Sequence, residues 1–181
     1  PSRAGITLHM TEHSVPSPIL ASVKRPTLRF MLSHPAHVIS LGFGSGLAPF
    51  APGTFGTLLG LFATRWLQPM VGDTIFFAGL AVALVLCVWA AGVTGRALGE
   101  SDHGSIVSDE VIAMALITAM LPGAAWKQLW AFLLFRLLDI WKPGPIGWAD
   151  RNVKGAFGVM LDDLIAAALT LLLFALWIRY F

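Results

Sequence analysis

Two long stretches of this sequence carry almost no charge, and they limit the folds that the chain can adopt. Residues 74–95 contain no charged side chain, and residues 157–178 are charged only at Asp162 and Asp163. About 20 consecutive apolar residues are enough for a helix to cross a lipid bilayer. The hydrophobic content of 56% and the mean hydropathy of +0.75 also exceed the values of ordinary globular proteins. The sequence therefore predicts a helical integral membrane protein.

Shorter apolar segments at 54–67, 111–121 and 126–141 complete the expected helices. Helix-breaking glycines and prolines follow the last two of them, which is typical of helix ends. Segments of this length can cross a thinned bilayer, re-enter it, or lie buried inside a bundle, and the sequence leaves these alternatives open. We expect an all-α, multi-helical integral membrane bundle of about five segments, some of them short or re-entrant.

Residues 1–33 differ from the rest of the chain in composition. They contain prolines and small polar residues without a helical apolar period, so we interpret them as a mobile N-terminal arm near the lipid headgroups. Residues 34–181 are long enough to form one helical domain with a single core. The net charge is only +2 and the basic residues are dispersed, which argues against nucleic-acid binding. Cys87 is the only cysteine, which excludes a disulfide framework and a thiolate zinc site.

The distribution of charge between the loops predicts an orientation. If all five segments cross the bilayer, one side receives the arm, residues 96–110 and residues 142–156, together with most of the basic residues. The positive-inside rule makes this side cytoplasmic. The same side receives most of the acidic residues and the glycine-rich stretch 42–57. We therefore expect one polar site at the cytoplasmic face.

Most of the ten acidic residues lie between positions 100 and 163, inside an otherwise apolar sequence. A carboxylate near lipid is costly unless a cation, a metal ion or a water-filled cleft compensates it. Hard cations such as Mg²⁺ prefer oxygen ligands from carboxylates, phosphates and water. The acidic residues, interleaved with basic ones, thus indicate a divalent metal site that also receives a phosphate. They are Glu100, Asp102, Asp109, Glu110, Asp139, Asp150, Asp162 and Asp163.

The segment 102–110 is the densest polar patch. Asp109 and Glu110 stand where a loop meets an apolar helix, which suits metal ligands, although Glu110 could equally complement the helix N-terminus. Asp102 is a candidate ligand or base. His103 is a candidate general acid, base or phosphoryl acceptor, and a simple hydrogen-bonding role is the alternative.

Two charged pairs lie on the predicted helices. Arg136 and Asp139 are three residues apart and share a face, so they form either an ion pair that locks the bundle or a phosphate and metal site. Asp162 and Asp163 point about 100° apart, so we expect only one of them to face the cleft.

Further groups could bind an anion. Arg151 offers a planar fork and Lys154 a point charge, although a solvated surface loop would look similar. The glycine-rich stretch 42–57, with Thr54 expected near the N-cap of the next helix, could offer backbone N–H groups to a phosphate. Its glycines could equally permit tight helix packing. The candidate phosphate-binding residues are Arg136, Lys142, Asp150, Arg151, Lys154, Gly44, Ser45, Gly46 and Thr54.

Several blocks of the sequence resemble the phosphatidylglycerophosphatase A family. They are GFGSGLAPFAPGT at 42–54, DHGSIVSDE at 102–110 and RLLDIWKPGPI at 136–146, followed by DRNVKG at 150–155 and GVMLDD at 158–163. The resemblance implies an all-helical, Mg²⁺-dependent phosphatase of phospholipid biosynthesis, which converts phosphatidylglycerophosphate to phosphatidylglycerol. It also implies a bacterial inner (cytoplasmic) membrane, a site that faces the cytoplasm, and a lipid substrate rather than a nucleic acid.

We accordingly predict Asp102, His103, Asp109 and Asp162 as catalytic residues. The predicted metal ligands are Asp109, Asp139, Asp162, Asp163 and Glu110, with Asp109 and Asp162 the strongest candidates. Mg²⁺ would neutralise the phosphomonoester, Asp102 or His103 would take a proton from the attacking water, and the basic residues would hold the phosphates. We prefer direct attack by water over a phospho-enzyme.

Two other protein classes fit part of the pattern. A helical bundle with carboxylates at one end could be a carboxylate-lined, cation-binding transporter or channel, although transport favours acidic residues at the bilayer midplane. A structural membrane protein whose charges only cap helices is the third possibility. The oligomeric state stays open at this point.

Overall fold

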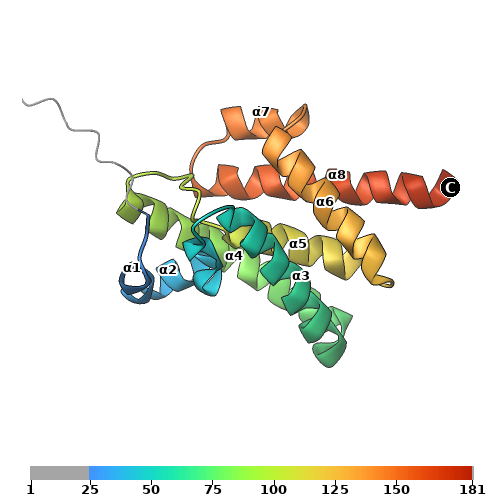
Figure 1. Ribbon diagram of the computed structural model, residues 1–181, viewed down its shortest axis with the longest axis horizontal. Helices are drawn as coiled ribbons and strands as arrows, with labels where there is room; N and C mark the ends of the chain where they lie inside the picture. The colour runs from blue at the N-terminus through green and yellow to red at the C-terminus, as the bar shows by residue number, and fades with distance from the viewer. Residues whose placement is uncertain (1–24, 181) are drawn as a thin grey trace, which may run out of the picture.

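The computed structural model describes residues 25–180, which are all-helical and contain no β-strand (Figure 1). The predicted all-α class is confirmed for this part of the chain. The elements in chain order are α1 (Leu28–Leu32), α2 (Pro35–Ser40), the 3₁₀ helix η1 (Gly42–Leu47), α3 (Pro52–Val71), α4 (Asp73–Leu98), α5 (Ser108–Met120), α6 (Ala125–Trp141), α7 (Pro145–Asn152) and α8 (Ala156–Tyr180).

The first described helix falls inside the range 1–33 that the sequence analysis interprets as an arm. Thr27 caps α1, because its hydroxyl oxygen accepts a hydrogen bond from the N–H of Phe30. Met31 is buried, so α1 packs on the helices that follow it. Residues 1–24 of the expected arm lie outside the described residues.

The five expected segments correspond to α3, α4, α5, α6 and α8. The start of α3 differs from the prediction, because Ala51 rather than Thr54 is the N-cap and the helix begins at Pro52. Proline is favoured in the first turn of a helix, where its missing N–H is not needed and its fixed φ fits. Thr54 therefore lies inside the first turn and does not cap it.

Helix α7 occupies a region that the sequence analysis interprets as a loop. Lys142 ends α6 in a left-handed conformation with a φ of 48°, and Pro145 then stands in the first turn of α7. The Pro-Gly-Pro sequence thus ends one helix and also begins the next. As a result Asp150 and Arg151 lie on a helix, and the loop prediction for them is wrong.

Helices α3 and α5 approach each other closely because small residues line one face of α3. A methyl group added at Gly60 would overlap the carbonyl oxygen of Val111, and one added at Gly56 would lie 2.8 Å from Cβ of Val107. Small residues permit such close packing of helices. The buried residues of this face are Gly53, Gly56, Thr57, Gly60 and Thr64.

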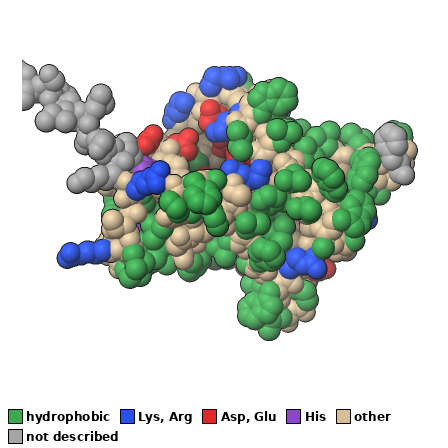
Figure 2. All heavy atoms as spheres, viewed as in Figure 1, with side chains coloured by type: hydrophobic (Ala, Val, Ile, Leu, Met, Phe, Trp, Pro, Cys, Tyr) green, Lys and Arg blue, Asp and Glu red, His purple; other side chains and the backbone are tan. Residues whose placement is uncertain are grey.

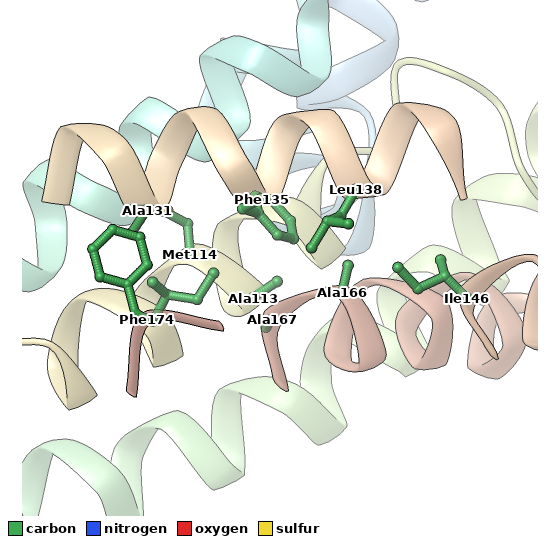
Figure 3. Packing of buried hydrophobic residues seen from close by; sticks show 10 residues of the cluster. Ala113, Met114, Ala131, Phe135, Leu138, Ile146, Ala166, Ala167 and Phe174 are labelled. Carbon is green, nitrogen blue, oxygen red and sulfur yellow. The ribbon is translucent and has the colours of Figure 1, made fainter. Parts of the chain in front are cut away.

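The main hydrophobic core lies between α5, α6 and α8 (Figure 3). Phe135 of α6 is fully buried at its centre, and burial of such a side chain contributes about 1.5–3 kcal/mol. Ile146 of α7 closes the core at one end and Phe174 of α8 at the other. The buried members are Ala113, Met114, Ile117, Ala131, Phe135, Leu138, Ile146, Ala166, Ala167 and Phe174.

Two helices of the described part, α4 and α8, are long and apolar enough to cross a membrane. Only 22% of the most apolar window of α4 is buried inside the protein, so most of its apolar surface points outward. Exposed side chains such as Val82 and Val85 belong to this surface of α4, and Leu172 is exposed on α8. Extended exposed apolar surface is typical of contact with lipid or a partner, which suggests membrane association.

Candidate metal and phosphate site

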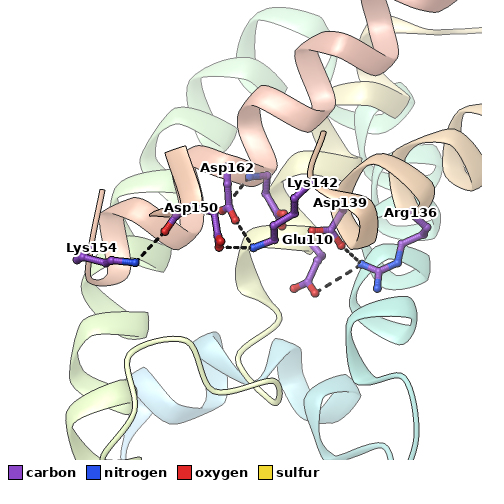
Figure 4. A network of polar contacts seen from close by, with 8 residues as sticks. Glu110, Arg136, Asp139, Lys142, Asp150, Lys154 and Asp162 are labelled. Atoms are coloured by element: carbon purple, nitrogen blue, oxygen red, sulfur yellow. Dashed lines mark hydrogen bonds and ion pairs between the residues drawn. The ribbon is translucent and has the colours of Figure 1, made fainter. Parts of the chain in front are cut away.

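Charged side chains gather at one end of the helical bundle. In the space-filling view most acidic and basic side chains lie over α7 and the neighbouring ends of α6 and α8, whereas hydrophobic side chains cover much of the remaining face (Figure 2). The first turn of α5, the last turns of α6, helix α7 and the first turns of α8 supply these residues (Figure 4). The helix order therefore brings together residues that are far apart in the sequence.

Asp109, Glu110 and Asp163 form a group of three carboxylates, which we call the carboxylate trio. One oxygen atom from each residue lies within 4.8 Å of the others. Asp109 is 5% exposed and Asp163 4%. Oδ1 of Asp109, Oε2 of Glu110 and Oδ2 of Asp163 are buried and have no hydrogen-bond partner among residues 25–180.

Such an arrangement fits a divalent cation. Buried carboxylates without partners are costly, and their negative charges repel each other at this distance. Mg²⁺ and Ca²⁺ accept carboxylate oxygens as ligands and would compensate both effects. The donor set contains only hard oxygen atoms, which disfavours a soft metal that prefers thiolates.

The surroundings of the trio change the acidity of its members. Burial raises the pKa of Asp109 well above its usual value, and the nearby negative charge of Glu110 raises it further. Burial likewise raises the pKa of Glu110, and the negative charge of Asp139 acts in the same direction. Without a cation these carboxyl groups favour the protonated form, and a bound divalent cation would favour the ionised form.

Arg136 lies between Asp139 and the trio. Its Nη1 donates a hydrogen bond to Oδ2 of Asp139 at 2.6 Å and lies 3.6 Å from Oε1 of Glu110 (Figure 4). Nε of Arg136 is buried and has no partner in the described part of the chain. Arg136 is therefore a cation fixed beside the trio, with a donor that the described residues leave unused.

Gly53 in the first turn of α3 faces the side chains of Glu110 and Arg136. A methyl group added there would overlap Oε1 of Glu110 and lie 3.1 Å from Nη2 of Arg136. The absence of a side chain thus lets the N-terminus of α3 approach the site. The N-terminus of a helix carries a partial positive charge that stabilises anions.

Lys142 connects the ends of three helices next to the trio. Its Nζ donates to Oδ1 of Asp150 and to Oδ2 of Asp162, both at 2.6 Å (Figure 4). Burial by itself lowers the pKa of Lys142, but the two carboxylates outweigh burial and raise the pKa above its usual value. The hydrogen bond from Lys142 in turn lowers the pKa of Asp150. These hydrogen bonds therefore favour the charged forms of Lys142 and Asp150.

Comparison with known proteins identifies the family. The family model for phosphatidylglycerophosphatase A matches residues 38–178. The chain belongs to this family. Phosphatidylglycerophosphatase A of Escherichia coli (strain K12) is 39% identical over 78% of this chain and 83% of its own length. The protein of that name from Haemophilus influenzae (strain ATCC 51907 / DSM 11121 / KW20 / Rd) is also 39% identical, over 78% of this chain and 88% of its own length.

A relative with a different name is also similar. A protein of Bacteroides thetaiotaomicron (strain ATCC 29148) is 35% identical over 84% of this chain and 96% of its own length, and its provisional name is phosphatidylinositol-3-phosphatase. No solved structure matches the chain. Membership of the phosphatidylglycerophosphatase A family confirms that this protein is an enzyme, a lipid phosphatase. The transporter or channel alternative is not favoured.

The structure places the predicted metal ligands in two neighbouring groups. Asp109, Glu110 and Asp163 form the trio, and Asp139 lies beside it through Arg136. Asp162, which the sequence analysis ranks among the strongest ligands, lies with Lys142 instead. The two neighbouring aspartates are thus divided between the groups, as their 100° separation on the helix requires.

The remaining predicted residues have other surroundings. Asp102 is exposed, and His103 is buried and accepts a hydrogen bond at Nδ1 from the N–H of Ser105, 3.1 Å away. Arg151 and Lys154 are exposed, and Nζ of Lys154 donates to the carbonyl oxygen of Asp150 at 3.1 Å.

The glycine-rich stretch serves packing in the described structure. Ser45 donates from Oγ to the carbonyl oxygen of Gly42 at 2.8 Å, and Gly44 has a φ of 107°. A methyl group at Gly46 would overlap the carbonyl oxygen of Ser105. η1 therefore packs on the loop that precedes α5, and Gly53, which the sequence analysis does not select, is the glycine that faces the trio. Its position directly after Pro52, at the start of a helix, is the sequence signal that marks it.

Proposed function

We propose that this enzyme dephosphorylates phosphatidylglycerophosphate to phosphatidylglycerol in phospholipid biosynthesis, with Mg²⁺ held by Asp109, Glu110 and Asp163. The observation that carries the proposal is the trio of buried carboxylates, whose oxygen atoms lie within 4.8 Å of one another beside Arg136. The names of the family and of two relatives supply the substrate.

The residues around the trio would bind the headgroup. Bound Mg²⁺ would supply a Lewis acid that polarises the phosphate and neutralises its charge. Arg136 offers a planar fork to the phosphate oxygens, and Asp139 fixes the orientation of this fork through its 2.6 Å hydrogen bond. Lys142 and the N-terminus of α3, which Gly53 opens to the site, would add positive potential.

The proton of the attacking water needs an acceptor, and the surroundings of His103 bear on the choice. Nδ1 of His103 accepts a backbone hydrogen bond, so the neutral ring carries its proton on Nε2. In this form Nε2 can donate a hydrogen bond, and Nδ1 is not free to accept the proton of the water. We therefore assign the acceptor role to Asp102, the exposed residue that precedes His103 in the sequence, and we retain direct attack by water.

The proposal places the site at the cytoplasmic face of a bacterial inner membrane that α4 and α8 cross. Gly95 and Arg96 of α4 line one pocket together with Gly155 and Ala156, so α4 ends where α8 begins. The chain between these two helices then starts and finishes on one side of the membrane, and its basic residues make that side cytoplasmic. The shorter helices α3, α5 and α6 would complete a multi-pass bundle around the two spans.

Phosphate release from the purified protein in detergent tests the function. We expect release from phosphatidylglycerophosphate with Mg²⁺ and none after addition of EDTA. Asp109→Asn should lower the rate about 100-fold, because a metal ligand is lost. Asp73→Asn, an exposed acidic residue at the other end of α4, is the matched control and should keep the wild-type rate.

The same assay separates the candidate substrates. Phosphatidylinositol 3-phosphate should be cleaved much more slowly than phosphatidylglycerophosphate. Faster cleavage of the inositol lipid would contradict the substrate, and undiminished release in EDTA would contradict the role of the metal.

A further inference from the structure

An open apolar groove lies between α6 and α8, away from the charged end of the molecule. Its volume is about 450 Å³, within the range of about 300–1,000 Å³ that is usual for ligand pockets. At its far end Trp126 and Trp177 stack edge to face, with ring centroids 5.7 Å apart. The groove is lined by Trp130, Leu134, Leu173, Phe174 and Trp177.

The groove lies on the seam between α6 and α8, and this seam leads to Lys142 and Asp162 at the charged end. Residues three or four apart on a helix lie on one face. On α6, Trp130, Leu134 and Leu138 follow one another at four-residue intervals along the side that packs toward α8, and Lys142 caps the end of this helix. The face of α8 consists of Asp162, Ala166, Leu169, Leu173 and Trp177. Because Lys142 and Asp162 are hydrogen-bonded, the two faces meet at the charged end, and the groove lies further along the same seam.

The distance between the charged end and the groove matches a lipid. With a rise of about 1.5 Å per residue, Leu134 lies about 12 Å from Lys142 along α6, and Trp177 about 22 Å from Asp162 along α8. The hydrocarbon core of a bilayer is about 30 Å thick, so one leaflet spans about 15 Å. A lipid whose headgroup lies at Lys142 would therefore bring the end of an acyl chain to the groove.

We propose that the groove holds the distal part of one acyl chain of the lipid substrate and so makes the enzyme prefer long-chain substrates. The inference rests on the proposed function, because it requires a phospholipid headgroup at the charged end. Charge complementarity supports this occupant: the anionic headgroup meets Arg136 and Lys142, and the apolar chain meets aromatic and aliphatic side chains. A bilayer lipid with a zwitterionic headgroup would lack the contact between an anionic headgroup and the basic side chains of Arg136 and Lys142.

Substrates of different acyl length test the inference by kinetics. Leu173→Trp fills the groove and should raise KM for dipalmitoyl phosphatidylglycerophosphate about tenfold, as expected when an apolar pocket loses contacts. KM for the dihexanoyl substrate, whose chains end before the groove, should not change, and this also shows that the variant folds. The matched control is Leu172→Trp, because Leu172 is exposed and does not line the groove; it should alter neither value.

A second groove-filling variant, Leu134→Trp, should show the same selective effect. An equal change for both substrates, or no change for the dipalmitoyl substrate, would overturn the inference. If the wild-type protein released no phosphate from either substrate, the proposed function itself would be contradicted.

Photo-crosslinking tests the groove without turnover. The probe is phosphatidylglycerophosphate with a diazirine at the end of one acyl chain, bound in detergent with EDTA and located by mass spectrometry. We expect labelling of Leu134 and Leu173 that excess unlabelled phosphatidylglycerophosphate suppresses and dipalmitoyl phosphatidylcholine does not. Equal suppression by both lipids would show contact with any lipid and would overturn the inference.

Discussion

Asp162 and Asp163 are neighbours in the sequence but contact different groups, so their substitution should have different effects. Asp163→Asn removes an oxygen ligand of the trio and should lower phosphate release about 100-fold, with a higher Mg²⁺ requirement. Asp162→Asn leaves Lys142 with Asp150 as its remaining carboxylate partner, and should lower the stability by about 1–2 kcal/mol while the Mg²⁺ requirement stays unchanged. Mg²⁺ titration of the activity and thermal unfolding measure the two effects. Identical Mg²⁺ curves for both variants would contradict this division.

The raised pKa values of Asp109 and Glu110 predict how Mg²⁺ binding depends on pH. A carboxyl group with a raised pKa in the folded protein keeps its proton above its usual range, and Mg²⁺ binds only the ionised form. Affinity should therefore weaken as the pH falls through the raised pKa values. We expect the increase in Tm that Mg²⁺ causes to shrink as the pH is lowered from neutral into the acidic range. A constant increase across this range would contradict the prediction, and Asp109→Asn should show a weaker pH dependence.

At this scale the sequence predicts the site only in part. The crowding of acidic residues in an apolar chain indicates a cation site, and Asp109, Glu110 and Asp163 do lie together. The choice between Asp162 and Asp163 could not be predicted, because it depends on the docking of α7, which brings Asp150 to the same lysine as Asp162. No local sequence pattern indicates the contact between Asp150 and Lys142.

At the scale of elements, the N-terminus of α3 is part of the site only because residue 53 has no side chain. Gly53→Ala would push Cβ into Oε1 of Glu110 and displace Arg136. We expect a loss of activity of at least about tenfold, since positioning groups beside metal ligands commonly contribute about 10–100-fold. The matched control is Gly79→Ala in α4, where an added methyl group meets nothing within 4 Å.

Gly79→Ala should retain activity and should not lower Tm, because alanine favours a helix over glycine by about 1 kcal/mol. The measurements are phosphate release and thermal unfolding of both variants. Wild-type activity of Gly53→Ala would show that α3 does not shape the site.

Hydrophobic length predicts the five long helices, and their limits agree with the structure to within a few residues, apart from the longer C-terminal end of α3. That helix continues through Pro69 to Val71, so the proline, which lacks an N–H and removes one backbone hydrogen bond, does not end it. Helix α7 is not predicted from the sequence, for a different reason. Two prolines flank Gly144, and a sequence pattern shows where they interrupt a helix but not that the second one begins another.

At the scale of the whole molecule, α4 and α8 border a segment whose two ends lie close together (Figure 1). In the proposed topology residue 100 is cytoplasmic and residue 73 lies at the opposite surface. Single cysteines at these positions, Glu100→Cys and Asp73→Cys in a Cys87→Ser background, test this arrangement. A membrane-impermeant thiol reagent should label Glu100→Cys only in inside-out vesicles and Asp73→Cys only in right-side-out vesicles. Labelling of both from the same side would contradict two antiparallel crossings.

The loop charges of the sequence predict that the candidate site residues share one end of the bundle, and the charged candidates on α5, α6, α7 and α8 do lie together there. The depth of the shorter helices is not predictable in the same way. Gly56 and Gly60 let α3 lie directly against α5, so these helices can bury their apolar residues against each other as well as in lipid. Hydropathy does not distinguish the two environments.

The hydrogen bonds of Lys142 limit how many further hydrogen bonds this side chain can donate to a lipid headgroup. An ammonium group has three hydrogens, and Asp150 and Asp162 occupy two of them. One hydrogen remains for the headgroup. If the side chain of Lys142 rotated away, Asp150 and Asp162 would both lose their hydrogen bond to it. We therefore expect Lys142 to keep its position when a lipid binds, so that the headgroup approaches the lysine while Lys142 continues to join α7 to α8.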